Sequence, residues 1–231
     1  MKVSIVVPTY NERDNIPELL RRIDRAIRPH GWDYEVVVVD DNSPDGTAEL
    51  AWQLSGLYPV KVIKRPGKLG LASAVVEGVK HADGDLVVVM DADLQHPPGV
   101  IPLIVEKLSR CDVVVASRYA KGGGVMGFPW YRRLMSRGAA VIAWLFIPES
   151  RKTSDPMSGF FGFRRRVIGD FDTVEPRGYK VLLDLLRRAR QAKVCDQPYV
   201  FVSREKGKSK LGLKVISAYI RHVLKLAFFE L

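Results

Sequence analysis

The stretch GDLVVVMDADLQHPP, residues 84–98, joins an apolar run to a cluster of polar side chains. The run LVVV, residues 86–89, is typical of a strand buried on both faces. Asp91, Asp93 and Gln95 follow at alternate positions, so their oxygen atoms project to the same side of an extended segment. Because crowded oxygen atoms need water or a positive partner, the stretch predicts a site at the end of a strand.

The first hundred residues alternate between apolar runs and amphipathic segments. Strands are expected at residues 2–10, 34–40, 60–65 and 85–93, and helices at residues 15–26, 47–58 and 71–82. This alternation predicts an α/β fold with a mostly parallel central sheet and helices on both faces. Ligands bind such sheets at the carboxyl ends of the strands, where the polar clusters PTYNE, DDNSPDG and DADLQ occur.

The second half of the chain has a less regular pattern. The elements expected here are a strand at residues 111–119, a helix at 130–146, a short strand or loop at 155–168, a helix at 178–191, a strand from 195 leading into a basic loop, and an amphipathic helix at 213–229. Gly122–Gly124 is interpreted as a flexible break, more typical of a mobile loop than of a domain boundary.

Composition limits the class of protein. The chain has 231 residues, of which 47% are hydrophobic and 27% charged, so it is expected to fold as a globular protein. The net charge of +10 favours a polyanionic partner: nucleic acid, an anionic membrane or a phosphorylated substrate. Nucleic acid is disfavoured, because the basic residues concentrate after Lys121 beside apolar faces and form no recognisable RNA-binding motif.

The cysteines and the longest apolar runs bear on location. Cys111 and Cys195 are far apart and lack metal-ligand spacing, so free thiols in a reducing compartment are expected. The N-terminal apolar run breaks at Pro8, too early for a signal sequence. Since no apolar run approaches the ~20 residues of a membrane span, a soluble or peripheral protein is expected.

The DADLQ cluster has the chemistry of a cation site. Mg²⁺ and Mn²⁺ bind a few carboxylate oxygens together with substrate phosphates, and Asp91, Asp93 and Gln95 offer such oxygens. A pair of solvated turn aspartates, with Asp91 capping a helix, is the alternative. The preceding strand and the polar ends of the other strands favour binding of a metal and a diphosphate.

The other strand ends suggest contacts to a nucleoside. Asp41 could accept hydrogen bonds from a ribose or a base, whereas residues 43–47 are interpreted as a turn and helix cap. Tyr10 could stack on a base and Glu12 could accept from its ring N–H groups; alternatively, Tyr10 fills the core. The stretch GKLGLASAVVEG, residues 67–78, lacks established phosphate-loop spacing and is interpreted as a tight turn before a helix.

Taken in order, these motifs resemble a known family. PTYNE, VVDDNSPDGT, DGDLVVVMDADLQHPP, SRY, SGFFGFRR and REKGKSKLG are similar to those of family 2 glycosyltransferases with a GT-A (Rossmann-like) fold, and within that family to the dolichyl-phosphate mannose synthase group. The resemblance covers essentially the whole chain. It implies one catalytic domain, residues 1–231, with a nucleotide-sugar-binding half at about 1–120 and an acceptor and membrane-interface half at about 121–231.

The resemblance implies a reaction as well. Such enzymes transfer mannose from GDP-mannose to a dolichyl (polyprenyl) phosphate, with inversion and with Mg²⁺ or Mn²⁺ as cofactor. A polyprenyl-phosphate glucosyltransferase that uses UDP-glucose remains the alternative. An inactive regulatory subunit is disfavoured by the intact DADLQ.

The resemblance assigns expected roles to particular residues. Asp91, Asp93 and Arg118 are the expected catalytic residues. The donor would bind Pro8, Tyr10, Glu12, Val39, Asp41, Asp91, Ala92, Asp93, Gln95, Lys180, Arg204 and Lys210. The metal would bind Asp91, Asp93 and Gln95, and the acceptor phosphate would bind Arg118, Arg132 and Ser136.

Two helices suggest a lipid surface as partner. Residues 130–146 and 215–229 combine apolar faces with Arg, Lys and His, a pattern typical of helices in a membrane interface, although each face could instead pack on the domain core. The expected location is peripheral, on the cytoplasmic side of a membrane, with a membrane-anchoring subunit as a possible partner.

Overall fold

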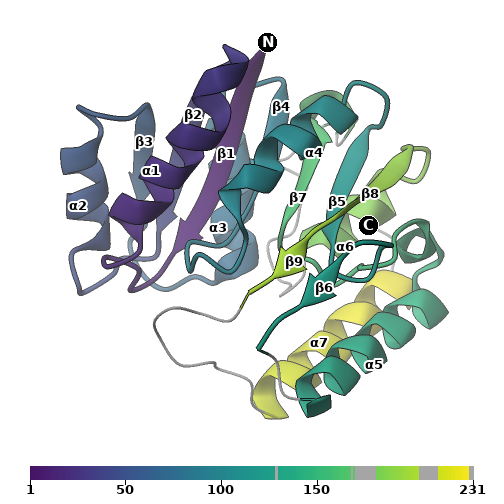
Figure 1. Ribbon diagram of the computed structural model, residues 1–231. Coiled ribbons are helices and arrows are strands. Elements are labelled where there is room, and N and C mark those ends of the chain that lie inside the picture. The colour runs from purple at the N-terminus through teal and green to yellow at the C-terminus, as the bar shows by residue number, and fades with distance from the viewer. Residues whose placement is uncertain (128–129, 168, 170–180, 203–212, 229–231) are drawn as a thin grey trace.

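A computed structural model shows a central sheet covered by helices on both faces (Figure 1). The structure describes residues 1–127, 130–167, 169, 181–202 and 213–228; for residues 131–133 and 213–218 it describes the backbone alone. The helices are α1 (Ile16–Ile27), α2 (Thr47–Leu54), α3 (Leu71–His81), α4 (Ile101–Lys107), α5 (Trp130–Phe146), α6 (Val181–Arg188) and α7 (Leu213–Phe228). The strands are β1 (Lys2–Thr9), β2 (Asp33–Asp40), β3 (Val60–Lys64), β4 (Leu86–Val89), β5 (Val113–Ser117), β6 (Gly124–Val125), β7 (Phe161–Arg164), β8 (Val194–Pro198) and β9 (Val200–Phe201).

The large sheet is mostly parallel, as the sequence predicts. Its seven strands run in the order β3-β2-β1-β4-β7-β5-β8, and β7 alone is antiparallel to its two neighbours. The registers Val6↔Val37 and Val6↔Val89 align β1 with β2 and β4, so the carboxyl ends of these strands meet at one edge. That edge carries the three polar clusters.

Two apolar layers enclose the sheet. On one face, α1, α2 and α4 bury side chains such as Leu19, Ala51 and Ile104 against the strands. On the other face, α3 and α6 contribute Val75 and Leu182 to a second cluster. Because both faces are covered, the strands are continuous Val-rich runs rather than alternating ones.

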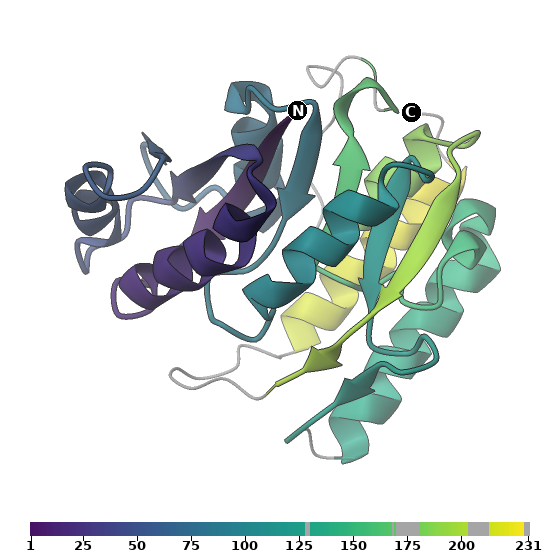
Figure 2. The ribbon, with the colours of Figure 1, turned by 45° about the horizontal axis from the view of Figure 1, so that its top comes forward.

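Helices α5 and α7 form an additional layer beyond the sheet. They lie side by side, with α6 between them and the strands (Figures 1 and 2). Ala143 of α5, Leu183 of α6 and Val223 of α7 share one buried cluster, and the Tyr219 hydroxyl donates to the Ala139 carbonyl at 2.6 Å. One side of each amphipathic helix is therefore packed within the protein.

The glycine run is more ordered than the sequence suggests. Gly124 begins β6, which pairs in parallel with β9, and Gly122 has a left-handed φ of 93°. A Cβ at Gly123 would lie 2.6 Å from the carbonyl oxygen of Ser117 and 3.0 Å from the carbonyl carbon of Arg118. The run therefore allows close backbone contact beside β5, which corrects the interpretation as a flexible break.

The expectation of free thiols is wrong. Cys111 and Cys195 form a disulfide with their Cα atoms 6.2 Å apart. Cys111 precedes β5, and Cys195 lies opposite Val114 in the adjacent strand β8. A sequence separation of 84 residues conceals this proximity, because only the sheet order brings the two strands together.

Candidate active site

Three sharp turns form the carboxyl edge of the sheet. Asn11 follows β1, Asn42 follows β2 and Leu94 follows β4, and all three adopt left-handed backbone conformations, with φ between 55° and 61°. Such a conformation is uncommon outside glycine and marks sites where the surrounding structure fixes the chain. Each of these residues lies within or next to the polar cluster that follows its strand.

Adjacent aspartates at the end of β2 have different roles. Asp40 is fully buried and accepts hydrogen bonds from the Thr9 hydroxyl at 2.9 Å and from the Ser43 amide at 2.8 Å. Asp45 accepts from the Thr47 amide at 3.0 Å, which supports the turn and cap role of residues 43–47. Asp40 therefore holds the turn together, which leaves Asp41 as the candidate ligand contact.

Asp41 faces the loop before α3. Its carboxylate lies 3.0 Å from Nε of Arg65 and accepts from the Gly70 amide at 2.9 Å, while Arg65 donates to the Ser73 hydroxyl at 2.7 Å. Arg65 and Asp41 are both buried. Asp41 thus joins the end of β2 to the loop before α3, a contact that the sequence did not indicate.

The other predicted nucleoside contacts lie along the same edge. Pro8 and Val39 are buried within β1 and β2 and are opposite each other in register. Tyr10 is half-buried, and the Lys68 ammonium lies 3.7 Å from its ring centroid. Glu12 accepts from the Asn15 side chain at 2.7 Å, just before α1. The Tyr10 ring is therefore accessible enough to meet a cation, and it does not fill the core.

The DADLQ cluster has one exposed and two buried oxygen-bearing side chains. The Asp91 side chain is 40% exposed, whereas Asp93 and Gln95 are buried. Asp93 accepts from the Gln95 amide at 3.2 Å, and the Gln95 side chain donates through Nε2 to the Val202 carbonyl at 3.0 Å. Ala92 is buried between the two aspartates. The cluster therefore has a fixed shape, with the Asp91 carboxylate turned outward.

His96 supports this cluster, a role that the sequence did not reveal. Its Nδ1 accepts from the Asp91 amide at 3.1 Å and lies 3.8 Å from the Asp91 carboxylate. The ring is buried and stacks on Phe160, with Phe201 edge-on at 5.7 Å between ring centroids. Acceptance at Nδ1 assigns the ring proton to Nε2 in the neutral form. His96 therefore holds the start of the cluster in place.

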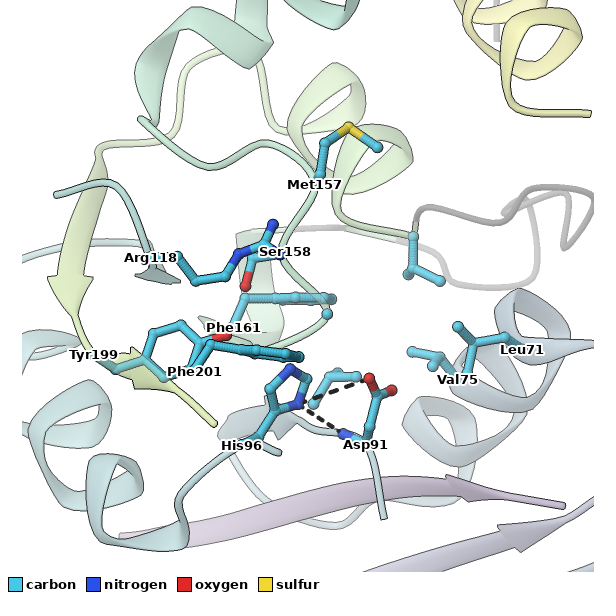
Figure 3. Close-up of a pocket in the computed structure, with 13 residues that line it drawn as sticks. Leu71, Val75, Asp91, His96, Arg118, Met157, Ser158, Phe161, Tyr199 and Phe201 are labelled. Carbon is cyan, nitrogen blue, oxygen red and sulfur yellow. Dashed lines mark hydrogen bonds and ion pairs between the residues drawn. The ribbon is translucent and has the colours of Figure 1, made fainter. Parts of the chain in front are cut away.

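A cavity of about 160 Å³ lies between the Asp91 side and the β5 side of the edge (Figure 3). Asp91 and His96 border it on one side, Arg118 on the other, and Leu71 and Val75 of α3 on a third. Gly159 also lines it, and a Cβ there would lie 3.3 Å from the Asp91 carboxylate. The cavity thus places a carboxylate and a guanidinium on facing walls.

Arg118 is held by a partner that the sequence did not indicate. Its Nε and Nη2 donate to the two carboxylate oxygens of Asp155 at 2.7 and 2.8 Å, and its amide donates to the same carboxylate at 3.1 Å. Asp155 is fully buried. Burial acts to lower the pKa of Arg118, but the hydrogen bonds and charge of Asp155 outweigh it and raise that pKa. The guanidinium is therefore permanently charged and fixed in direction.

Of the remaining predicted site residues, the structure describes the side chain of Ser136 but not those of the others. Ser136 accepts from the Tyr119 hydroxyl at 2.9 Å, and this tyrosine follows Arg118 directly. A second cavity, of about 290 Å³, lies beside them and is lined by Arg118, Tyr119 and Arg137. The Arg132 side chain, and Lys180, Arg204 and Lys210 entirely, lie outside the described residues.

The donor atoms at DADLQ fit a hard divalent cation. Two carboxylates and one amide are oxygen ligands of the kind that Mg²⁺ and Mn²⁺ prefer. Within the described part of the chain, no group of three His, Cys, Asp or Glu side chains is arranged to hold a metal ion. Asp91, Asp93 and Gln95 do not form a group of that kind, because only two of the three are carboxylates. The cavity beside Asp91 has space for further ligands.

The fold resembles that of known proteins. The mostly parallel sheet, with carboxylates after β4, has a GT-A-like fold. A solved structure supports this: mannosyl-3-phosphoglycerate synthase from Rubrobacter xylanophilus matches with a TM-score of 0.71 at 21% identity, covering 98% of this chain and 73% of that one. The model for glycosyl transferase family 2 matches residues 4–171. The chain belongs to glycosyltransferase family 2.

Curated relatives narrow the resemblance. A dolichol-phosphate mannosyltransferase of Pyrococcus furiosus is 48% identical over all 231 residues, which span 65% of its length. A dolichol-phosphate mannosyltransferase of Saccharomyces cerevisiae is 35% identical over 240 aligned positions, covering 100% of this chain and 88% of that protein. The resemblance inferred from the motifs is thus confirmed.

In the described part of the chain, every helix falls short of the length and apolar character that crossing a bilayer requires.

Proposed function

We propose that this protein transfers mannose from GDP-mannose to dolichyl (polyprenyl) phosphate, with inversion at the anomeric carbon. The observation that carries the proposal is the pair of facing walls in the cavity, with Asp91 on one and Arg118 on the other. Both substrates of such a reaction are anionic, so a site that joins them needs positive charge on both sides. Arg118 supplies it on one wall, and a divalent cation bound at Asp91 would supply it on the other. The similarity to relatives named dolichol-phosphate mannosyltransferase supports the choice of sugar and acceptor.

The reaction forms one bond and breaks one. An oxygen of the lipid phosphate attacks the anomeric carbon, and the bond from that carbon to the donor diphosphate breaks as the nucleoside diphosphate leaves with the electron pair. The acceptor is a phosphate monoester, already mostly dianionic near pH 7 because its second pKa is about 6. It therefore needs no general base.

The donor is assigned to the edge formed by β1, β2 and β4. Tyr10, Glu12 and Asp41 would meet the nucleoside, with Pro8 and Val39 as its floor. Asp91, Ala92, Asp93 and Gln95 would surround the diphosphate and sugar. A divalent cation held by Asp91, Asp93 and Gln95 would offset charge on the departing diphosphate. Mn²⁺ accompanies UDP-glucose in a structure of glucosyl-3-phosphoglycerate synthase from Mycobacterium tuberculosis, a fold relative with a TM-score of 0.65.

The acceptor phosphate is assigned to the Arg118 side. Arg118 has a fixed guanidinium that can bind a phosphate oxygen, and Ser136 lies within reach of the same region through Tyr119. Arg132 would join them, and Lys180, Arg204 and Lys210 would close over the nucleotide. Asp91, Asp93 and Arg118 are the proposed catalytic residues.

The lipid tail is assigned to the outer face of α5 and α7. Exposed apolar side chains form a stripe on α5, at Trp130, Leu134, Val141 and Leu145. Ile220, Leu224 and Phe228 form a second stripe on α7, and Phe146 meets Phe228 edge-on with 6.3 Å between ring centroids. Two adjacent apolar stripes on helices rich in basic residues suit the interface of an anionic membrane. We infer a peripheral position on the cytoplasmic face.

Vesicle flotation tests this surface. Leu134→Glu should reduce binding to vesicles that contain anionic lipid, because it places a charge in the apolar stripe. Leu103→Glu is the matched control, since Leu103 is also exposed but lies on α4, on the opposite side of the sheet from α6. Equal binding by both variants would contradict the assignment of the stripe.

A transfer assay tests the reaction. Dolichyl phosphate in detergent is incubated with GDP-mannose or UDP-glucose, with Mg²⁺, Mn²⁺ or a chelator. We expect mannose transfer that is lost with the chelator and a β-linked product in NMR spectra. Glucose transfer alone would move the specificity to the polyprenyl-phosphate glucosyltransferase. Transfer that survives chelation would remove the metal from the proposal.

Binding of Mn²⁺, followed by electron paramagnetic resonance, tests the metal site independently of turnover. Asp93→Ala should weaken binding of the ion in the presence of GDP. Asp83→Ala removes an exposed carboxylate at the opposite edge of the sheet, where it pairs with Lys2, and should leave binding unchanged. Equal affinities in the two variants would exclude Asp93 as a ligand.

A further inference from the structure

Arg118 is the last link of a hydrogen-bonded chain that begins in another strand. Its partner Asp155 lies in the segment before β7, and that segment is held in turn by Asp196 of β8. Asp196 Oδ1 accepts from the Thr153 hydroxyl at 2.5 Å, and Oδ2 accepts from the Ser154 amide at 2.9 Å and from its hydroxyl at 2.5 Å. One carboxylate therefore fixes two consecutive residues.

Two routes lead from Asp196 to Arg118. In the first, the Thr153 hydroxyl accepts from the Asp155 amide at 3.2 Å, and Asp155 binds the Arg118 guanidinium through both of its oxygens. Thr153 and Asp155 are both buried, so water cannot readily replace these contacts. The direction of the guanidinium thus depends on where Asp196 holds the segment.

The second route runs through two serine hydroxyls and ends on backbone amides. The Ser154 and Ser117 hydroxyls are 2.7 Å apart, and the Ser117 hydroxyl accepts from the amides of Tyr119 and Ala120 at 3.1 and 3.0 Å. These bonds fix the turn that carries Arg118. The Arg118 side chain and the turn that follows Arg118 are therefore both tied to the Asp196 carboxylate.

The position of Asp196 is itself fixed. The neighbouring residue Cys195 forms the disulfide with Cys111, and strand β8, which contains Asp196, pairs with β5. The backbone carbonyl of Asp196 accepts a hydrogen bond from Lys107 Nζ at 2.7 Å. Asp196 is absent from the described linings of both cavities named above. The contacts that link it to the site run through the residues that it holds.

We propose that Asp196 is a positioning residue for Arg118, acting through Thr153, Ser154 and Asp155. The inference rests on the proposed function for its catalytic consequence, because Arg118 is assigned there to the acceptor phosphate. A small displacement of a group that binds a reacting phosphate can reduce the rate by about 10²-fold. Asp196 thus determines how well the acceptor is oriented, although it touches no substrate.

The first measurement reports the geometry without turnover. In protein with ¹⁵N-labelled arginine, the Nε–H signal of Arg118, assigned by its loss in Arg118→Lys, should exchange slowly with solvent because Asp155 binds it. We expect Asp196→Ala to accelerate that exchange. Asp112→Ala is the matched control: Asp112 accepts from the Lys193 amide at 3.0 Å, so it also ties β8 to β5, but at the end away from the site.

The second measurement reports the consequence. With dolichyl phosphate and GDP-mannose, Asp196→Ala should lower kcat/KM for the acceptor by about tenfold or more while the KM for the donor stays as in the wild type. Asp196→Asn should retain most activity, because its amide oxygen can accept from the Ser154 amide and its NH₂ can donate to the Thr153 hydroxyl. If Asp196→Ala fails to fold, Thr153→Val breaks the first route with a side chain of similar volume.

The outcomes separate the two claims. Unchanged Arg118 exchange in both Asp196→Ala and Thr153→Val would overturn the positioning role. If the Arg118 Nε–H exchanges faster in Asp196→Ala but the acceptor kinetics stay as in the wild type, Asp196 is not important for the reaction. Equal losses of kcat/KM in Asp196→Ala and Asp112→Ala would lead to the same conclusion. Absence of mannose transfer by the wild type would contradict the proposed function instead, and the exchange measurement would still decide whether Asp196 positions Arg118.

Discussion

At the scale of single residues, Gly159 controls the space available to Asp91. A Cβ at this position would lie 3.3 Å from the Asp91 carboxylate and 3.4 Å from Cε1 of His96. Gly159→Ala should therefore displace the carboxylate by a few tenths of an ångström and weaken Mn²⁺ binding and transfer, by about tenfold for the rate. Electron paramagnetic resonance and the transfer assay measure both effects.

The control for this prediction is Gly99→Ala, because a Cβ at Gly99 would meet no atom within 4 Å. Both variants should keep the thermal midpoint of the wild type to within a few degrees. Wild-type affinity for Mn²⁺ in Gly159→Ala would show that the Asp91 carboxylate has freedom that the structure does not suggest.

Replacing Arg118 alone should lower the free energy of unfolding more than replacing Arg118 and Asp155 together. Arg118→Ala leaves a fully buried carboxylate without its guanidinium, which for buried pairs costs about 3–5 kcal/mol of unfolding free energy. The double variant Arg118→Met/Asp155→Leu removes both charges and should recover much of that loss. Urea unfolding of the single and double variants measures the difference, and equal midpoints would contradict a strong coupling.

The sequence drew attention to residues that line the cavity, and it missed the residues that hold them in place. Asp91 and Arg118 belong to short motifs next to strands, and the structure places both on the cavity. His96 and Asp155 were missed, because their roles depend on contacts that arise only after distant segments pack. Asp155 lies 37 residues from Arg118, and no local pattern marks that pairing.

At the scale of elements, the disulfide joins β8 to the turn before β5. The double variant Cys111→Ser/Cys195→Ser should lower the free energy of unfolding by about 2–4 kcal/mol. The main reason is that the unfolded chain gains conformational entropy when the crosslink between positions 84 residues apart is removed. Urea unfolding under oxidising conditions measures the change. Dithiothreitol should shift the wild type by a similar amount and leave the variant unaffected.

The expected elements largely match the observed ones, for a physical reason. Helix α5, Trp130–Phe146, has the predicted boundaries, and helix α1 and strand β2 differ from theirs by one residue. The two helices have a clear helical periodicity, and α1 carries a start signal in the proline at position 17, whereas β2 is marked by its continuous run of valines. Strand β7 was ambiguous because a four-residue run gives too little periodicity to distinguish a strand from a loop.

At the scale of the whole molecule, the two halves of the chain share one sheet. Strand β7 comes from the second half, yet it lies between β4 and β5 of the first half. This insertion was not predictable from the sequence, because the β-α alternation suggests only consecutive parallel strands. The nucleotide-binding and acceptor halves are therefore regions of a continuous sheet, and assigning them separate roles stays a proposal.

The shared sheet predicts a single unfolding transition. A fragment of residues 1–120 lacks β7, so the edges of β4 and β5 and the apolar face beneath α6 would be exposed, and we expect it to aggregate or remain unfolded. For the full chain, circular dichroism and tryptophan fluorescence should give coincident urea transitions. A soluble fragment with a cooperative transition of its own would contradict this expectation.

The bond between Cys111 and Cys195 also closes a covalent ring. The ring contains β5, α5, β7 and α6, and therefore Arg118, Asp155 and the α5 stripe. A single cut by a protease within the ring would leave both pieces linked as one molecule, whereas a cut outside it would release a fragment. The residues on the acceptor side of the cavity therefore stay covalently attached to the rest of the protein after a single cleavage between Cys111 and Cys195.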